Sequence, residues 1–141
     1  MPSARSGARS RRAVSPARSK RAAAWLFVYG TLMRGEPLYP VLRNVARFEG
    51  EGRARGTLVS FGDYPGLLDG DGWVRGEVYV LDDPDLLPIV DREEEEYNFV
   101  RRRTGVDMID GRRVRAWVYR YSGPRASSTL IPGGDWRNRC R

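Results

Sequence analysis

Apolar residues occur along the chain in short runs that glycine, proline or aspartate interrupts. The first run, Trp25 to Tyr29, is continuous and ends at Gly30, which is typical of a buried strand that stops at a turn. We expect Gly30 to adopt a positive φ or to let a ligand approach the backbone closely. The N–H groups of Thr31 and Leu32 would then suit a carboxylate or a polarised carbonyl, and an ordinary turn is the alternative.

Alternating or apolar runs predict the remaining strands. Four such runs are residues 53–59, 73–81, 99–106 and 114–121. Asp110 and Gly111 are expected to join the last two runs as a hairpin. The Asp-Gly-Asp-Gly sequence of residues 69–72 predicts another tight turn, so that Leu67 and Leu68 pair with residues 73–81.

Two segments have helical periodicity. Leu38, Leu42 and Val45 are spaced by four and three residues, which predicts a short amphipathic helix. Residues 86–96 predict a second helix with Asp85 as its N-cap. Its expected core-facing residues are Leu86, Leu87, Ile89 and Val90.

The many short strands do not alternate regularly with helices, which indicates an α+β fold. We expect a small mixed, partly closed β-barrel with one or two flanking helices.

The second predicted helix ends in four consecutive glutamates, residues 93–96. Successive helical residues point about 100° apart, so these side chains cannot all face solvent. Continuing the apolar face brings Glu94 to the inner side and leaves Glu93 and Glu96 more exposed. The alternative is a solvated acidic helix end that pairs with the arginines at 101–103.

The formal net charge of +7 is concentrated in the first 24 residues. They hold seven of the 25 basic residues and no Asp or Glu, so residues 25–141 carry no net charge. Rich in Ser, Arg, Ala and Pro, residues 1–24 are expected to be a disordered basic tail before one folded domain over residues 25–141. Nucleic-acid binding by the tail is the alternative, and the neutral domain argues against it.

The residue types that the chain lacks restrict its chemistry. It has no histidine, which excludes Ser-His-Asp and Cys-His catalysis and histidine-containing zinc sites. Cys140 is the single cysteine, so we expect no disulfide and a reducing, cytoplasmic location. No apolar run approaches the roughly 20 residues of a membrane-spanning helix, so we expect a soluble protein. Acid–base chemistry then falls to a carboxylate with a shifted pKa, a tyrosine or the substrate.

Five motifs are distributed over most of residues 26–137. They are Phe27-Val28-Tyr29-Gly30-Thr31-Leu32-Met33-Arg34-Gly35, Tyr64-Pro65-Gly66-Leu67, Val74-Arg75-Gly76-Glu77-Val78-Tyr79, Asp91-Arg92-Glu93-Glu94 and Gly134-Asp135-Trp136-Arg137. In this order they resemble the γ-glutamylcyclotransferase family, in the branch that includes γ-glutamylamine cyclotransferase and plant AIG2-like proteins.

The resemblance implies a small barrel with flanking helices and a reaction that needs no cofactor and no metal. A small γ-glutamyl amide or amine would cyclise to 5-oxoproline and release the free amine. The resemblance also implies one catalytic carboxylate, Glu94, acting as general acid and base. This agrees with the helical-face argument, which places Glu94 on the inner side of the helix. A buried glutamate with a pKa of roughly 6 to 7 can take a proton and return it.

The family's substrate-binding segment corresponds to Tyr29, Gly30, Thr31 and Leu32. Two further residues are candidates for substrate contact. One is Tyr64, an aromatic side chain that could line the amine side of the site; the alternative for it is a core or hairpin aromatic. The other is Phe99, at the position of a family tyrosine.

Two positions depart from the family pattern. Glu95 replaces a small residue after the family glutamate; if close in space, it would raise the pKa of Glu94 further or exchange roles with it. Phe99 lacks the hydroxyl of the family's Tyr-x-Arg motif, unless Tyr97 supplies it. A small-molecule-binding AIG2-like domain without turnover is therefore the alternative function. The sequence leaves open the released amine and the oligomeric state.

Overall fold

The computed structural model describes residues 23–139. The tail expected over residues 1–24 lies outside the described residues up to position 22, and so does Cys140. The described elements are β3 (Ala24–Val28), α2 (Tyr39–Arg43), β4 (Ala46–Ser60), β5 (Pro65–Leu81), the 3-10 helix η1 (Pro84–Leu86), α3 (Leu87–Glu95), β6 (Phe99–Met108), β7 (Arg113–Tyr121), β8 (Thr129–Leu130) and the 3-10 helix η2 (Trp136–Asn138).

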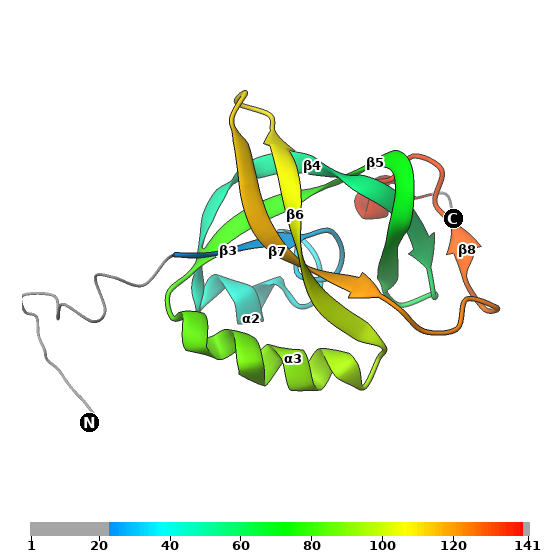
Figure 1. The fold of residues 1–141 in the computed structure, drawn as a ribbon, viewed down its shortest axis with the longest axis horizontal. Helices are drawn as coiled ribbons and strands as arrows, with labels where there is room; N and C mark the ends of the chain where they lie inside the picture. The colour runs from blue at the N-terminus through cyan, green and yellow to red at the C-terminus, as the bar shows by residue number, and fades with distance from the viewer. Residues whose placement is uncertain (1–22, 140–141) are drawn as a thin grey trace, which may run out of the picture.

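Strands β3 to β7 close into a mixed barrel (Figure 1). Neighbouring strands follow the order β5, β3, β7, β6 and β4, and the pairing of β4 with β5 completes the ring. β3 runs parallel to β7, where Leu26 pairs with Trp117, and antiparallel to β5. The expected α+β class and mixed barrel with flanking helices are confirmed.

The interior of the barrel is apolar because each strand directs one row of side chains inward. Phe27, Val74, Val78, Val106 and Val118 are each at most 1% exposed. They come from β3, β5, β6 and β7, so one core joins strands that are distant in sequence.

The hairpin predicted around residues 69–72 is wrong. β5 runs without interruption through these residues, and both of its halves pair with β4. Leu68 lies opposite Thr57 and Trp73 lies opposite Arg55, so the four intervening residues of β5 form an irregularity beside Gly56. The Asp-Gly signal therefore marks a bulge in a long strand.

Both predicted helices are present, and in Figure 1 α3 lies along one side of the barrel. The Asp83 carboxylate, and not the predicted Asp85, caps the start of η1 by accepting a hydrogen bond from the Asp85 N–H at 2.9 Å. Leu87 is buried as predicted, but Ile89 is 54% exposed. Ile89 is two residues and about 200° from Leu87, which turns it away from the core.

The chain after β8 returns to the barrel through Trp136, which is 1% exposed. Its indole N–H donates a hydrogen bond to the Glu36 carboxylate at 3.0 Å. Among residues 23–139, no helix has both the length and the apolar character required to cross a membrane.

Candidate active site

Tyr29 directly follows β3 and is 7% exposed. Its hydroxyl donates a hydrogen bond to the Tyr119 carbonyl at 2.6 Å and accepts one from the Leu67 N–H at 3.2 Å. β3 lies between β5 and β7 and ends at Val28, so the phenol bridges these two strands just beyond the end of β3. Burial raises the pKa of Tyr29 far above its ordinary value, which keeps the phenol protonated.

Gly30 begins a turn that is closed by a hydrogen bond from the Met33 N–H to the Gly30 carbonyl at 3.0 Å. Within residues 23–139, the N–H groups of the two central residues, Thr31 and Leu32, donate to no protein acceptor. Gly30 does not have a positive φ, so the first of its two expected roles is wrong. Glycine is needed there because a Cβ would lie 2.5 Å from Cγ of Pro65.

Glu94 lies in the last turn of α3, seven residues after the buried Leu87. It is half-buried, whereas Glu93 and Glu96 are exposed, as the helical periodicity predicts; Glu95 is exposed as well. Burial, with a smaller contribution from the charge of Glu93, raises the pKa of Glu94 to about 6. The neighbouring carboxylate that acts on Glu94 is therefore Glu93, and not the expected Glu95.

The structure brings Glu94 close to two tyrosines. The charge of Glu94 adds to the effect of burial in raising the pKa of Tyr29 and that of Tyr119. Tyr119 lies on β7 and is 6% exposed. The end of α3 and the end of β3 thus meet at one place on the barrel, although they are more than 60 positions apart in sequence.

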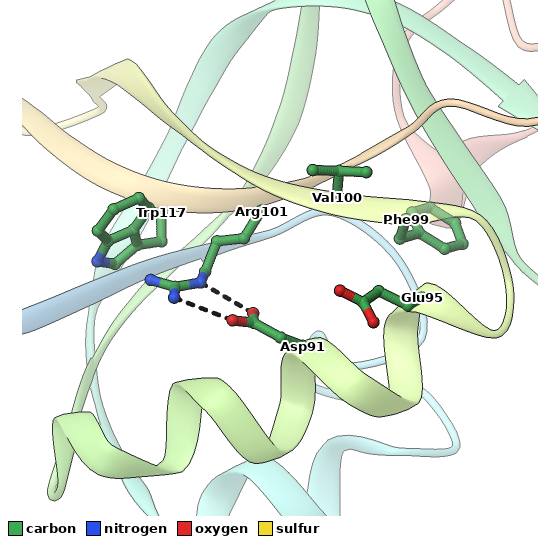
Figure 2. A pocket seen from close by; sticks show the side chains of 6 residues that line it. All are labelled: Asp91, Glu95, Phe99, Val100, Arg101 and Trp117. Atoms are coloured by element: carbon green, nitrogen blue, oxygen red, sulfur yellow. Dashed lines mark hydrogen bonds and ion pairs between the residues drawn. The ribbon is translucent and has the colours of Figure 1, made fainter.

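Asp91 holds α3 against the barrel (Figure 2). Nε and Nη2 of Arg101 on β6 donate to its two oxygens at 2.9 and 3.0 Å, and the Tyr119 hydroxyl donates to Oδ1 at 2.7 Å. Although burial opposes it, these bonds hold the pKa of Asp91 below its ordinary value. Within residues 23–139, no three His, Cys, Asp or Glu side chains are grouped as metal ligands would be.

A pocket of about 190 Å³ lies between α3 and the β6–β7 pair. Its lining residues are Asp91, Glu95, Phe99, Val100, Arg101 and Trp117. Figure 2 shows the Glu95 carboxylate at the end of α3, below Phe99. Glu94 does not line this pocket, so the two glutamates point to different surroundings.

Tyr64 and Phe99 belong to one aromatic cluster, with ring centroids 6.0 Å apart. Tyr64 also packs against Tyr97 at 5.9 Å, and Phe99 packs against Tyr121 at 5.4 Å. Tyr97 is 56% exposed and belongs to the cluster through Tyr64, whereas the tyrosines that pack directly on Phe99 are Tyr64 and Tyr121. The cluster borders the Gly30 turn because Tyr64 precedes Pro65, which packs on that glycine.

The sequence analysis missed Glu77, which is fully buried on β5. Its Oε1 accepts hydrogen bonds from the Arg34 N–H and the Tyr79 hydroxyl, both at 2.9 Å. Its Oε2 accepts from Nε of Arg34 at 2.9 Å and Nη1 of Arg137 at 3.4 Å. The available signal was a glutamate directly before the apolar run of residues 78–81.

These features can be compared with those of known proteins. The family model described as gamma-glutamyl cyclotransferase, AIG2-like, matches residues 26–138, and the chain belongs to this family. A putative gamma-glutamylcyclotransferase from Vibrio cholerae is 35% identical over 119 residues, which cover 81% of this chain and 96% of the relative. The family suggested by the five motifs is therefore confirmed.

Two further comparisons concern a named activity and a solved structure. Gamma-L-glutamyl-butirosin B gamma-glutamyl cyclotransferase from Niallia circulans is 32% identical over 119 residues, which cover 79% of this chain and 74% of that protein. The crystal structure of an AIG2-like protein from Mus musculus has a TM-score of 0.64 and 30% identity, and the match covers 74% of this chain and 82% of its own.

Proposed function

We propose that this protein converts a small γ-glutamyl amide or amine to 5-oxoproline and the free amine, with Glu94 as general acid and base. The α-amine nitrogen of the substrate attacks its own γ-carbonyl carbon, and the bond from that carbon to the leaving nitrogen breaks. Glu94 accepts a proton from the attacking ammonium and returns one to the departing amine. One C–N bond forms, one breaks and protons pass from the attacking to the leaving nitrogen, so the reaction needs no further reactant.

The observation that carries the proposal is the environment of Glu94. A carboxyl group with a pKa of about 6 is ionised at neutral pH, yet it is basic enough to hold a transferred proton. Asp91, three residues earlier on the same helix, has its pKa lowered and its oxygens occupied by Arg101 and Tyr119. Asp91 therefore positions the helix, and Glu94 is the carboxylate that is left to exchange protons.

The turn after β3 supplies the complementary groups. The N–H groups of Thr31 and Leu32 have no protein acceptor among the described residues, so they can bind the oxyanion that forms on the γ-carbonyl oxygen or the α-carboxylate. One well-placed donor of this kind contributes about 3 kcal/mol to transition-state stabilisation. The Tyr29 hydroxyl uses its proton on the Tyr119 carbonyl, so toward a substrate it can only accept, for example from an ammonium.

The amine that leaves is not specified by these groups. The Niallia circulans relative is named for γ-glutamyl-butirosin B. For this chain we propose only the shared part of such substrates, a free γ-glutamyl group on a small amine.

The test is a mass-spectrometric assay for 5-oxoproline with a panel of γ-glutamyl amines and peptides. The Glu94→Gln variant keeps the size of the side chain but cannot carry the proton, so we expect turnover at least about 100-fold below that of the parent chain. Glu96→Gln changes an exposed glutamate two residues away and is expected to leave turnover within about twofold.

Full turnover by Glu94→Gln would refute its role as acid and base. Saturable binding of γ-glutamyl compounds by the folded parent chain, without any product, would favour the alternative of a binding domain.

A further inference from the structure

Arg120 and Asp69 border the same gap between β5 and β7 that Tyr29 bridges. The Tyr29 hydroxyl bonds to the backbone of Tyr119 on β7 and of Leu67 on β5. Arg120 and Asp69 follow these two residues by one and two positions, and their side chains meet across the gap, with Nη1 and Oδ1 3.7 Å apart. Arg120 therefore lies near the phenol, and Asp69 reaches Arg120 from the opposite side of the gap.

The guanidinium of Arg120 is largely covered by the protein but has few hydrogen-bonding partners. Its side chain is 21% exposed and continues the inward row of β7 that contains Ala116 and Val118, which are 2% and 0% exposed. Its ion pair with Asp69 exceeds hydrogen-bonding distance, and in the part of the chain that the structure describes its guanidinium donates no hydrogen bond. A guanidinium carries five N–H donors in a planar fork, so this one is free to bind a ligand.

Asp69 binds the Arg120 guanidinium only weakly, so a ligand carboxylate can compete with it. Its side chain is 100% exposed and lies in the irregular part of β5, residues 69–72. An ion pair with a fully solvated carboxylate contributes little to stability. A carboxylate that arrives with a substrate can replace Asp69 and form two parallel, charge-assisted hydrogen bonds.

The position of Arg120 fits the reacting end of the site. Burial has the largest effect on the pKa of Tyr29. The charge of Glu94 also raises this pKa and the charge of Arg120 lowers it, so both groups lie close to the phenol. A ligand that contacts Glu94 through an ammonium and Arg120 through a carboxylate carries both signs of charge within a few bonds. An α-amino acid moiety has this arrangement.

We propose that Arg120 binds a carboxylate of the γ-glutamyl substrate in place of Asp69. The proposal rests on the substrate class of the proposed function and adds a requirement for an anionic group. Two sources are chemically equivalent, the α-carboxylate of the glutamyl group and a carboxylate on the leaving amine, as in a γ-glutamyl amino acid. The experiment below separates them.

The experiment measures affinity by calorimetry, with the full chain carrying Glu94→Gln to suppress turnover. One probe is γ-glutamyl-methylamide, whose only carboxylate is the α-carboxylate, and the other is γ-glutamyl-alanine, which has one on each side. Adding Arg120→Met is expected to weaken binding by about 10- to 100-fold, as for a lost hydrogen bond to a charged group.

Arg113→Met is the matched control. Arg113 lies at the other end of β7 and forms an ion pair of the same length, 3.7 Å, with Asp107. We expect it to change affinity less than twofold. Asp69→Asn removes the competing carboxylate and is expected to tighten binding, whereas a purely structural Arg120–Asp69 pair predicts no gain. Thermal unfolding of each variant verifies that it is folded.

Weaker binding of both probes identifies the α-carboxylate, and weaker binding of γ-glutamyl-alanine alone identifies the carboxylate on the amine. Unchanged affinity of the Arg120 variant for both probes overturns the proposal. The proposal is also overturned if the chain with Glu94→Gln alone shows no saturable binding of either probe.

5-Oxoproline formation is measured separately with the parent chain. Product without any effect of Arg120 refutes only this proposal, and binding that depends on Arg120 without product refutes only the proposed function.

Discussion

Asp91 and Glu94 are three residues apart on one helix, but their surroundings shift their pKa values in opposite directions. Two hydrogen-bonding partners on the barrel hold Asp91 ionised, whereas burial makes Glu94 easier to protonate. Such a separation of two neighbouring carboxyl groups is how proteins divide positioning from proton transfer. The four consecutive glutamates are therefore not equivalent, because Glu94 alone among them is half-buried.

The raised pKa of Glu94 predicts a pH-dependent cost to stability. Its pKa is about 6 in the folded chain and about 4.5 when unperturbed, so burying the charge destabilises the fold above pH 6 and costs little below pH 4.5. Glu94→Gln is therefore expected to raise the free energy of unfolding by about 1 to 2 kcal/mol at pH 8. The gain should shrink steadily between pH 6 and 4.5.

Urea unfolding of the parent chain and the variant between pH 4 and 8 measures this difference. Glu96→Gln serves as the control, since Glu96 is exposed and its substitution should show no such trend. A gain that is constant with pH would mean that the Gln side chain stabilises the helix by another route.

At the scale of elements, Glu77 joins three segments that are distant in the chain. It ties the turn after β3 to β5 through Arg34 and ties the region of η2 to both through Arg137. Arg34, Glu77 and Arg137 belong to three of the five family motifs. The arginines and the glutamate of these motifs thus have a structural role, which is to hold the turn after β3 in place. Contact with substrate is not needed to explain them.

Glu77→Ala is expected to lower the free energy of unfolding by about 3 kcal/mol, because it leaves Arg34 and Arg137 without their buried acceptor. Glu51→Ala removes another carboxylate that binds Arg34, at 3.1 Å, but Glu51 is 47% exposed. That control should cost less than about 1 kcal/mol. Equal losses measured by urea unfolding would show that burial of Glu77 has no special energetic role.

The predictions from sequence succeeded where a local pattern determines the outcome. Heptad-like spacing was enough to place Glu94 on the inner side of α3, and a continuous apolar run was enough to identify β3. They failed where a distant partner decides. Residues 69–72 have the composition of a hairpin turn, but the segments on both sides of them pair with β4 instead of with each other. No local signal pairs Arg120 with Asp69, which are 51 positions apart.

At the scale of the whole molecule, the barrel makes one site from parts that the chain keeps separate. The end of β3, the end of α3 and the gap between β5 and β7 converge because β3 is enclosed by its neighbours and stops early. The motifs indicated this family, but only the closed ring gives Tyr29 two bridging hydrogen bonds and makes Arg120 its neighbour. The distribution of charge, by contrast, could be read from the sequence alone: residues 1–24 carry seven positive charges and residues 25–141 carry no net charge.

We propose that residues 25–141 form one domain that folds without the preceding tail. Removing residues 1–22 takes away seven positive charges and leaves a chain with no net charge. Because nonspecific binding to polyanions depends on accumulated positive charge, we expect salt-sensitive retention on heparin or DNA to disappear. The thermal unfolding midpoint and the rate of 5-oxoproline formation should stay those of the full chain.

The matched control is the full chain with Arg113 and Arg115 changed to Gln, which removes exposed positive charge from the domain and leaves the tail intact. This variant should elute from heparin close to the parent chain. If instead the truncated chain kept a steep salt dependence and the double variant lost it, the polyanion-binding surface would lie on the β6–β7 side of the barrel. The arginines there would then require a function of their own.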